Sequence, residues 1–305
     1  MKNIFIIWGG GLIGTHVVKE FMLNGDNVIS LTKSGKSVFW EKTLKWNRKN
    51  IKTIKNILKE NEFNLVIDMI PFSLDDAIIL FDVLRKYKIP LIACSSIDVY
   101  KAYWILWGTE WFKSYQKCPM KEKDSLRKKI WIEWMGYNKL EIEELYLTPP
   151  WHVTIIRLPA VYWSPDLSRI NNYLPYILKS KKEIIIPYNK LNWITSRSFN
   201  KNCAFWIFLA KDCQWKNIYN IAEKKDYSEK EWIEKIWKIF HWKWKITEQW
   251  KHQNNLDFKQ NWYVDSSKIR DELWFYEKYD IDEGLLDNIL QYVYKKKNIT
   301  YIKNY

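Results

Sequence analysis

The chain has 305 residues, of which 47% are hydrophobic and 28% are charged. This balance is typical of a folded protein with a sizeable core and excludes disordered and fibrous classes. The chain contains no run of about 18 apolar residues, which is the length that would predict a membrane span. We therefore expect a cytoplasmic protein. The net charge of +14 favours polyanionic partners, but the lysines are spread along the chain and form no dense basic block. Nucleic-acid binding therefore stays open as an alternative.

The N-terminal segment has the pattern of a dinucleotide-binding βαβ unit. An apolar strand over Lys2–Trp8 is followed by a glycine-rich turn over Gly9–Gly14 and by a helix from Thr15. Glycines in this position let the backbone approach a pyrophosphate at the helix N-terminus. We expect the following residues to bind the cofactor: Trp8, Gly9, Gly10, Gly11, Leu12, Ile13 and Gly14.

The segment after the second predicted strand, Val28–Leu31, bears on the choice of cofactor. It reads Thr32-Lys33-Ser34, where an acidic residue would hold a ribose 2′-hydroxyl. A cation suits a 2′-phosphate, so the sequence favours NADP over NAD. A lysine that is simply solvated is the alternative.

The middle of the chain alternates apolar strands with helical segments. Strands are predicted over 65–70, 91–95, 153–158 and 218–222, and helices over 77–87 and 137–147. This alternation is typical of a doubly wound parallel sheet. Helical patches over 230–240 and 283–294 predict a smaller α-rich C-terminal lobe. We expect residues 1–165, with 193–223 returning to them, to form the nucleotide-binding domain, and residues 166–305 to form mainly the substrate lobe.

Glycine is rare in this chain and tryptophan is abundant. The chain has nine glycines and 20 tryptophans, whereas a glycine content of about 7% would give roughly 21 glycines. Several tryptophans stand where turn chemistry favours glycine. Our hypothesis is that these are glycines misread from a reassigned stop codon, and the alternative is a truly tryptophan-rich chain. The candidates are Trp8, Trp46, Trp104, Trp163, Trp215 and Trp274.

Cysteines and histidines show no ligand spacing. The four cysteines, at 94, 118, 203 and 213, form no CxxC pair, and the four histidines are scattered. We therefore expect reduced thiols, no disulfide framework and no metal site.

Motifs along almost the whole chain resemble one family. They are 2–31, Ser95–Tyr100, Lys139-Leu140-Glu141, Arg157–Tyr162, Ile218–Ile221 and Asp265–Trp274. This set, in this order, resembles the NAD-dependent epimerase/dehydratase family of extended short-chain dehydrogenases/reductases. The resemblance implies a Rossmann-type doubly wound parallel sheet with a smaller C-terminal substrate lobe. The family's loop motif is GxxGxxG, so Trp8 stands at its first glycine.

The resemblance also implies catalytic roles. Ser96 matches the serine or threonine that polarises the substrate, and Lys139 matches the lysine of the YxxxK pair, which holds the nicotinamide ribose and lowers the pKa of the tyrosine. The tyrosine position is occupied by Met135, a departure that puts ordinary hydride chemistry in doubt. Tyr137 is a candidate replacement for this tyrosine, but it lies about 200° round the helix from the face that position 135 shares with Lys139. Tyr100 is another candidate proton donor.

Further binding residues follow from the same resemblance. Arg197 resembles the arginine that meets the diphosphate of a nucleotide-sugar, and Asn47 resembles a residue that reaches the adenine. The expected substrate contacts are Asp98, Tyr100 and Arg197. The other expected cofactor contacts are Thr32, Lys33, Asn47, Arg48, Ile70, Pro71, Ser95, Lys139, Pro159 and Val161.

Two functions remain open from the sequence. The first is an NAD(P)-dependent epimerase, dehydratase or reductase that acts on a sugar-like or nucleotide-sugar substrate, with a homodimer implied by family analogy only. The second is a catalytically atypical cofactor-binding protein that binds RNA or a protein partner, which the missing tyrosine and the +14 charge favour.

Overall fold

A computed structural model describes residues 1–45, 51–71, 73–108, 114–127, 138–148, 151–163, 173, 183–213, 216–241, 245–249 and 256–302. Its centre is a seven-stranded sheet in the order β11-β6-β5-β4-β1-β2-β3, in which every pair is parallel. The strands are β1 (Asn3–Ile7), β2 (Asn27–Thr32), β3 (Lys42–Lys45), β4 (Leu65–Asp68), β5 (Leu91–Ser96), β6 (Val153–Leu158) and β11 (Asn217–Asn220). The predicted doubly wound parallel sheet is confirmed.

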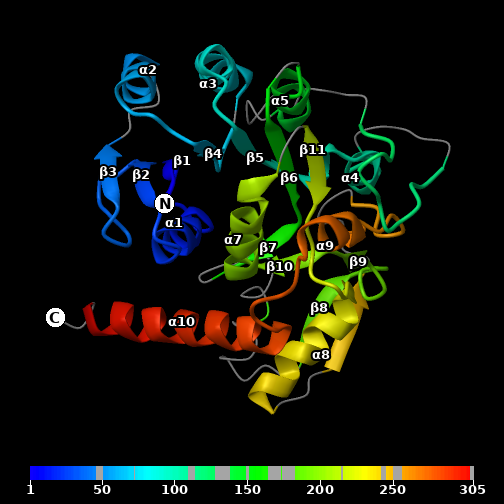
Figure 1. Ribbon diagram of the computed structural model, residues 1–305. Coiled ribbons are helices and arrows are strands. Elements are labelled where there is room, and N and C mark those ends of the chain that lie inside the picture. Colours follow the sequence, from blue (N-terminus) through cyan, green and yellow to red (C-terminus); the bar gives the residue numbers. More distant parts are fainter. Residues whose placement is uncertain are drawn as a thin grey trace.

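Helices cover both faces of this sheet (Figure 1). One face packs against α1 (Gly14–Leu23) and α7 (Asn200–Leu209), and the other against α2 (Ile51–Glu60), α3 (Leu74–Tyr87) and α5 (Lys139–Tyr146). Because side chains alternate along a strand, Ile4 and Ile6 of β1 enter the first core while Phe5 and Ile7 enter the second. Burial on both faces explains why these strands are continuous apolar runs.

The chain order reverses between β1 and β4, which are neighbours in the sheet. Chain connections leave this point in opposite directions, which opens a crevice at the carboxyl ends of the strands where ligands of open α/β sheets bind. The glycine-rich turn lies there because it directly follows β1.

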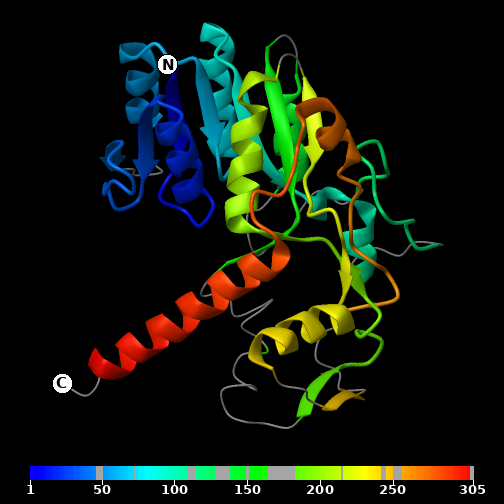
Figure 2. The ribbon, with the colours of Figure 1, turned by 60° about the horizontal axis from the view of Figure 1, so that its bottom comes forward.

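The C-terminal part forms a second, smaller layer below the sheet (Figure 2). It contains α8 (Glu229–Phe240), the first turns of α10 (Ile281–Ile302) and the parallel pair of β8 (Glu183–Pro187) with β13 (Lys245–Gln249). These elements share a separate core that includes Trp232, Ile236 and Leu285. Both views show that the later turns of α10 extend away from the body. The predicted boundaries of the two lobes remain a prediction.

The structure also contains shorter elements. They are η1 (Ile97–Val99), α4 (Lys101–Leu106), β7 (Ala160–Tyr162), β9 (Ile194–Thr195), β10 (Arg197–Phe199), η2 (Ala210–Asp212), β12 (Tyr227–Ser228) and α9 (Ser267–Leu273).

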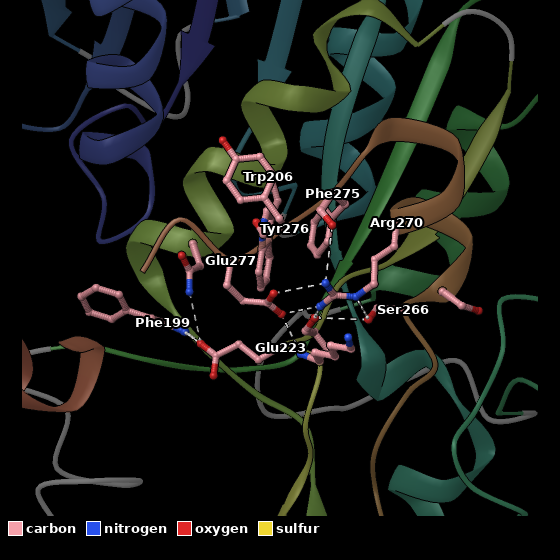
Figure 3. A network of polar contacts seen from close by, with 12 residues as sticks. Phe199, Trp206, Glu223, Ser266, Arg270, Phe275, Tyr276 and Glu277 are labelled. Carbon is pink, nitrogen blue, oxygen red and sulfur yellow. Dashed lines mark hydrogen bonds and ion pairs between the residues drawn. The ribbon is translucent and has the colours of Figure 1, made fainter. Parts of the chain in front are cut away.

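A polar network anchors the segment after α9 to the end of β11 (Figure 3). The Arg270 guanidinium donates to the Ala222 carbonyl at 2.9 Å and to the Ser266 hydroxyl at 3.1 Å, and it pairs with Glu277 at 2.5 Å. Trp206 of α7 donates to the Tyr276 carbonyl at 2.7 Å. These contacts hold the segment after α9 against the layer that contains the central sheet.

None of the helices in the described ranges is both long and apolar enough to cross a membrane.

Candidate functional site

A cavity of about 270 Å³ opens at the crevice between β1 and β4. Most of its lining comes from the turn after β1, and the rest follows β4 and lies in and after β7. The lining residues are Trp8, Gly11, Leu12, Ile13, Gly14, Met69, Ile70, Val161 and Trp163. The structure therefore brings together residues of the turn that the sequence predicts to bind the cofactor, with Ile70 and Val161 joining them from distant segments. Met69 and Trp163 were not predicted as site residues.

The turn between β1 and α1 is built so closely that it requires glycine. A Cβ on Gly14 would lie 2.4 Å from the Trp8 carbonyl oxygen, and one on Gly9 would lie 2.8 Å from the Ser30 Cβ. Glycine at these positions lets α1 approach β1 and β2. No side chain caps the N-terminus of α1, and its first turn has no acidic residue. The positive end of the helix dipole thus faces the turn without a built-in counter-ion.

Asn200, the first residue of α7, forms a hydrogen bond to this turn. Its amide nitrogen donates to the Leu12 carbonyl oxygen at 2.9 Å, and the side chain is 7% exposed. The contact spans 188 residues of sequence, so local sequence patterns carry no signal for it.

Lys139 is buried beneath the ends of β4 and β5. Its ammonium donates to the Pro71 carbonyl at 2.9 Å and to the Cys94 carbonyl at 3.0 Å. Burial lowers the pKa of Lys139, and the nearby Asp68 carboxylate acts in the opposite direction. Pro71, another predicted cofactor contact, meets this lysine through its backbone.

Asp68, at the end of β4, is a second buried ionisable group at this point that the sequence did not single out. Burial raises its pKa to about 6, and the charge of Lys139 opposes this shift. It accepts a hydrogen bond from the Tyr146 hydroxyl at 2.9 Å and one from the Ile70 amide at 3.2 Å. Asp68 thus lies close to a lysine and a tyrosine, and it directly precedes Met69 and Ile70, which line the cavity.

The two serines at the end of β5 differ in their surroundings. Ser96 is half-buried, and its hydroxyl oxygen accepts a hydrogen bond from the Asp98 amide at 3.3 Å, which caps η1. Ser95 is 5% exposed, and its hydroxyl has no hydrogen-bond partner among the described residues. Pro159, at the end of β6, is buried.

Tyr100, a candidate proton donor whose position in the resembled family is more often structural, is engaged within the protein. Its side chain is fully buried. Its hydroxyl donates a hydrogen bond to Asn220 Oδ1 at 2.8 Å and accepts one from the Arg157 guanidinium at 2.8 Å. Arg157 in turn pairs with Glu143 at 2.7 Å. Burial raises the pKa of Tyr100 to about 12, which opposes release of its proton. Asp98, its neighbour on η1, is 9% exposed.

Arg197, the residue expected to meet a diphosphate, also makes contacts within the protein. It is 6% exposed, pairs with the buried carboxylate of Glu229 and donates to the Tyr227 carbonyl at 3.1 Å. Its guanidinium also lies 4.7 Å from the centre of the Trp232 ring. Glu229 additionally pairs with Lys190 at 2.8 Å, so the arginine's donors serve an internal carboxylate.

An exposed cation directly follows β2. Thr32 is buried, and its hydroxyl oxygen accepts a hydrogen bond from the Gly35 amide at 3.0 Å. Lys33 is exposed. The buried Glu41 accepts hydrogen bonds from Ser30, Ser37 and the amide of Phe39, so its charge is used within this loop.

Several predicted positions lie outside the described residues. They are Trp46, Asn47, Arg48, Met135, Tyr137 and Trp215. Within the described ranges, no group of three or more His, Cys, Asp or Glu side chains could hold a metal ion, and all four cysteines are free thiols.

Solved structures share this architecture over nearly the full chain. A dTDP-glucose 4,6-dehydratase from Bacillus anthracis in complex with NAD superposes with a TM-score of 0.74 at 15% identity, covering 97% of this chain and 98% of that one. A UDP-glucose 4-epimerase from Bifidobacterium longum, in complex with NAD+ and UDP, gives a TM-score of 0.74 at 16% identity, covering 97% and 99%. The chain has the fold of these enzymes.

A third structure repeats the match. The UDP-glucose 4-epimerase of Stenotrophomonas maltophila, with bound NAD and formylated UDP-arabinopyranose, gives a TM-score of 0.75 at 14% identity, covering 98% of this chain and 100% of that one. No family model and no curated protein sequence matches the chain. The family resemblance seen in the motifs is thus confirmed at the level of the fold.

Proposed function

We propose that the protein binds a nicotinamide dinucleotide in the cavity between β1 and β4 and acts on a sugar-like or nucleotide-sugar substrate. The observation that carries the proposal is the glycine-built turn at the topological switch point, beside the buried Lys139. Solved proteins with this fold carry NAD, and two of them also carry a uridine nucleotide or nucleotide-sugar.

The residues of this site fit a dinucleotide with one exception. The backbone of the turn and the uncapped N-terminus of α1 would hold the pyrophosphate, and Ile70 and Val161 would line the path beyond it. The exception is the Trp8 side chain, which lines the same cavity and lies against Gly11. When bound, a nicotinamide supplies the acceptor or donor of a hydride.

The chain's own groups would prepare the reacting end. Lys139 would place a positive charge beside the ribose, because its ammonium is fixed by two backbone carbonyls at the ends of β4 and β5. Ser96 would offer a hydroxyl at the end of β5 to polarise a substrate oxygen. Tyr100 would take no part, since Arg157 and Asn220 hold its hydroxyl.

The cofactor preference that we propose is NADP over NAD. The support is the exposed Lys33 directly after β2, together with the absence of an acidic residue at that point of the sequence. Glu41, the first acid that follows Lys33 in the chain, is buried and accepts several hydrogen bonds, so it is not available to a ribose.

Titration with NADPH and NADH tests this proposal. We would follow the fluorescence of each dinucleotide with the chain as written and with a Trp8→Gly variant, and then add UDP-glucose. Saturable binding of either dinucleotide supports the proposal, and failure of both proteins to bind either one contradicts it.

A second function has its own support in the sequence. Met135 at the tyrosine position and the net charge of +14 favour a cofactor-binding protein without hydride chemistry that binds RNA. RNA binding that weakens steeply as salt rises, with no turnover of NADPH or NADH, would favour this function.

A further inference from the structure

Tryptophan occupies backbone positions that suit glycine. Among the described residues, six non-glycine residues have a positive φ, and three of them are Trp8 at 70°, Trp40 at 63° and Trp274 at 54°. With 20 tryptophans in 305 residues, a random placement would put fewer than one tryptophan in such a set. A Cβ disfavours this region and a bulky side chain there is an outlier, whereas glycine adopts it freely.

Two of these tryptophans gain no burial that would offset the strain. Trp40 is 86% exposed and Trp274 is 87% exposed. Trp274 is the left-handed residue that ends α9, the position at which helices most often carry glycine. The ring contact of Trp40 is with its chain neighbour Phe39, at 4.9 Å between centroids, and it leaves most of the indole exposed.

Trp8 combines the same backbone conformation with an obstructed site. A Cβ built on Gly11 would lie 2.6 Å from Trp8 Cδ1 and 3.0 Å from Trp8 Nε1, so the indole lies directly against the second glycine of the motif. The ring also lines the cavity that we propose for the dinucleotide. A glycine at residue 8 would remove both the backbone strain and the ring.

Other tryptophans lack a positive φ, and several of them are buried. They serve as internal controls. Trp206 and Trp232 are fully buried core side chains, and neither has a positive φ. Trp104, in α4, is 5% exposed, and the Arg127 guanidinium lies 4.9 Å from its ring centre. Trp104 and Trp163, both suspected from the sequence, lack the positive φ that would single out glycine.

We propose that residues 8, 40 and 274 are glycine in the protein as its own cell makes it, because a stop codon that encodes glycine there has been read as tryptophan. A glycine at position 8 stands at the first position of the GxxGxxG motif, where it joins Gly11 and Gly14 and completes the motif. The consequence for ligand binding rests on the proposed function, whereas the argument from φ and exposure does not.

The first experiment measures stability in variants of the recombinant chain. Trp40→Gly and Trp274→Gly should each raise the melting temperature by about 2 °C, since each relieves backbone strain at an exposed position. Trp232→Gly, the matched control at a buried position, should lower it. A fall of the melting temperature in both Trp40→Gly and Trp274→Gly would overturn the proposal.

The second experiment reads the residues directly. Peptide mass spectrometry of the protein purified from its own source should find glycine at positions 8, 40 and 274, and tryptophan at all three would overturn the proposal. Trp8→Gly should bind NADPH at least tenfold more tightly than the chain as written. Glycine in the native peptides without dinucleotide binding by Trp8→Gly would support the proposal and count against the proposed function.

Discussion

The ammonium of Lys139 donates a hydrogen bond of 3.0 Å to the carbonyl oxygen of Cys94. The contact fixes a buried cation at the end of β5, where a second bond to Pro71 draws it towards the end of β4. A lysine without these carbonyls would move among rotamers, whereas here its charge has one position. Binding of a ligand at the neighbouring cavity should therefore depend on this side chain.

Replacing the lysine tests its role in binding. Lys139→Met in the Trp8→Gly background should weaken NADPH binding at least tenfold, because the buried charge is removed while most of the side-chain volume is kept. The fluorescence titration measures this loss, and circular dichroism verifies the fold. Lys19→Met, on the outer side of α1, is the control and should bind as before. Equal losses in the two variants would show that the effect is general electrostatics.

The sequence alone predicted those elements that leave a pattern in consecutive residues. Apolar runs such as 91–95 and 153–158 predicted strands of the central sheet, and the glycines after β1 predicted the turn. The strand β3, which reads Lys-Thr-Leu-Lys, was not predicted because only its pairing with β2 defines it. The helix α7 gave no amphipathic period, because all of it except Lys201 and Leu209 is buried.

The candidate site was predictable only in part, for a physical reason. Gly11 and Gly14 line the cavity at the turn after β1, which is the turn that the sequence motif predicted. Tyr100 and Arg197 were expected at the site from family positions, but their exposure depends on partners far along the chain. Asn220 holds Tyr100 across 120 residues, and Glu229 holds Arg197 across 32. Such partners leave no local pattern in a single sequence.

The buried position of Tyr100 leads to a prediction that separates structure from catalysis. Tyr100→Phe should destabilise the fold by about 1–3 kcal/mol, since it leaves donors of Arg157 and an oxygen of Asn220 with one partner fewer in a buried place. Thermal unfolding measures this effect. Turnover per folded molecule should not change, and a loss of kcat at unchanged stability would restore Tyr100 as the proton donor.

The ion pair of Arg157 with Glu143 should contribute strongly to the same region. Both side chains are almost fully buried, at 1% and 3% exposure. Glu143→Ala leaves an uncompensated buried guanidinium, so we expect a loss of about 3–5 kcal/mol. The exposed pair of Lys2 with Asp212 is the control, and Asp212→Ala should change stability by less than about 1 kcal/mol. Similar losses in the two variants would contradict the assigned role of burial.

Lys33 provides a test of the cofactor preference. Lys33→Gln should weaken NADPH binding several-fold and leave NADH binding unchanged, because only NADPH carries the 2′-phosphate that an ammonium would meet. Paired titrations in the Trp8→Gly background measure the ratio of the two dissociation constants. Lys36→Gln, in the same loop and also exposed, serves as the comparison. A parallel loss for NADPH and NADH in Lys33→Gln would remove the basis for the preference.

Glu223 should make stability depend on pH. Burial raises its pKa to about 7, and its ordinary value is near 4.5. A carboxyl whose pKa is higher in the folded than in the unfolded state binds more protons when folded, so its contribution to stability is present at low pH and is lost as pH rises from about 4.5 to about 7. Each pH unit inside this window corresponds to about 1.4 kcal/mol at most.

A glutamine at this position should remove that dependence. The donors Phe199, Tyr162 and Asn202 all reach the same carboxyl oxygen, Oε1, and an amide oxygen can accept their hydrogen bonds in its place. Glu223→Gln should therefore unfold at a higher urea concentration than the parent protein at pH 8 and at nearly the same concentration at pH 4.5. Asp68 and Asp226, with pKa values raised to about 6, add the same trend to both proteins, so the difference between them isolates Glu223. An unchanged difference between pH 4.5 and pH 8 would show that Glu223 titrates alike in the folded and unfolded chain.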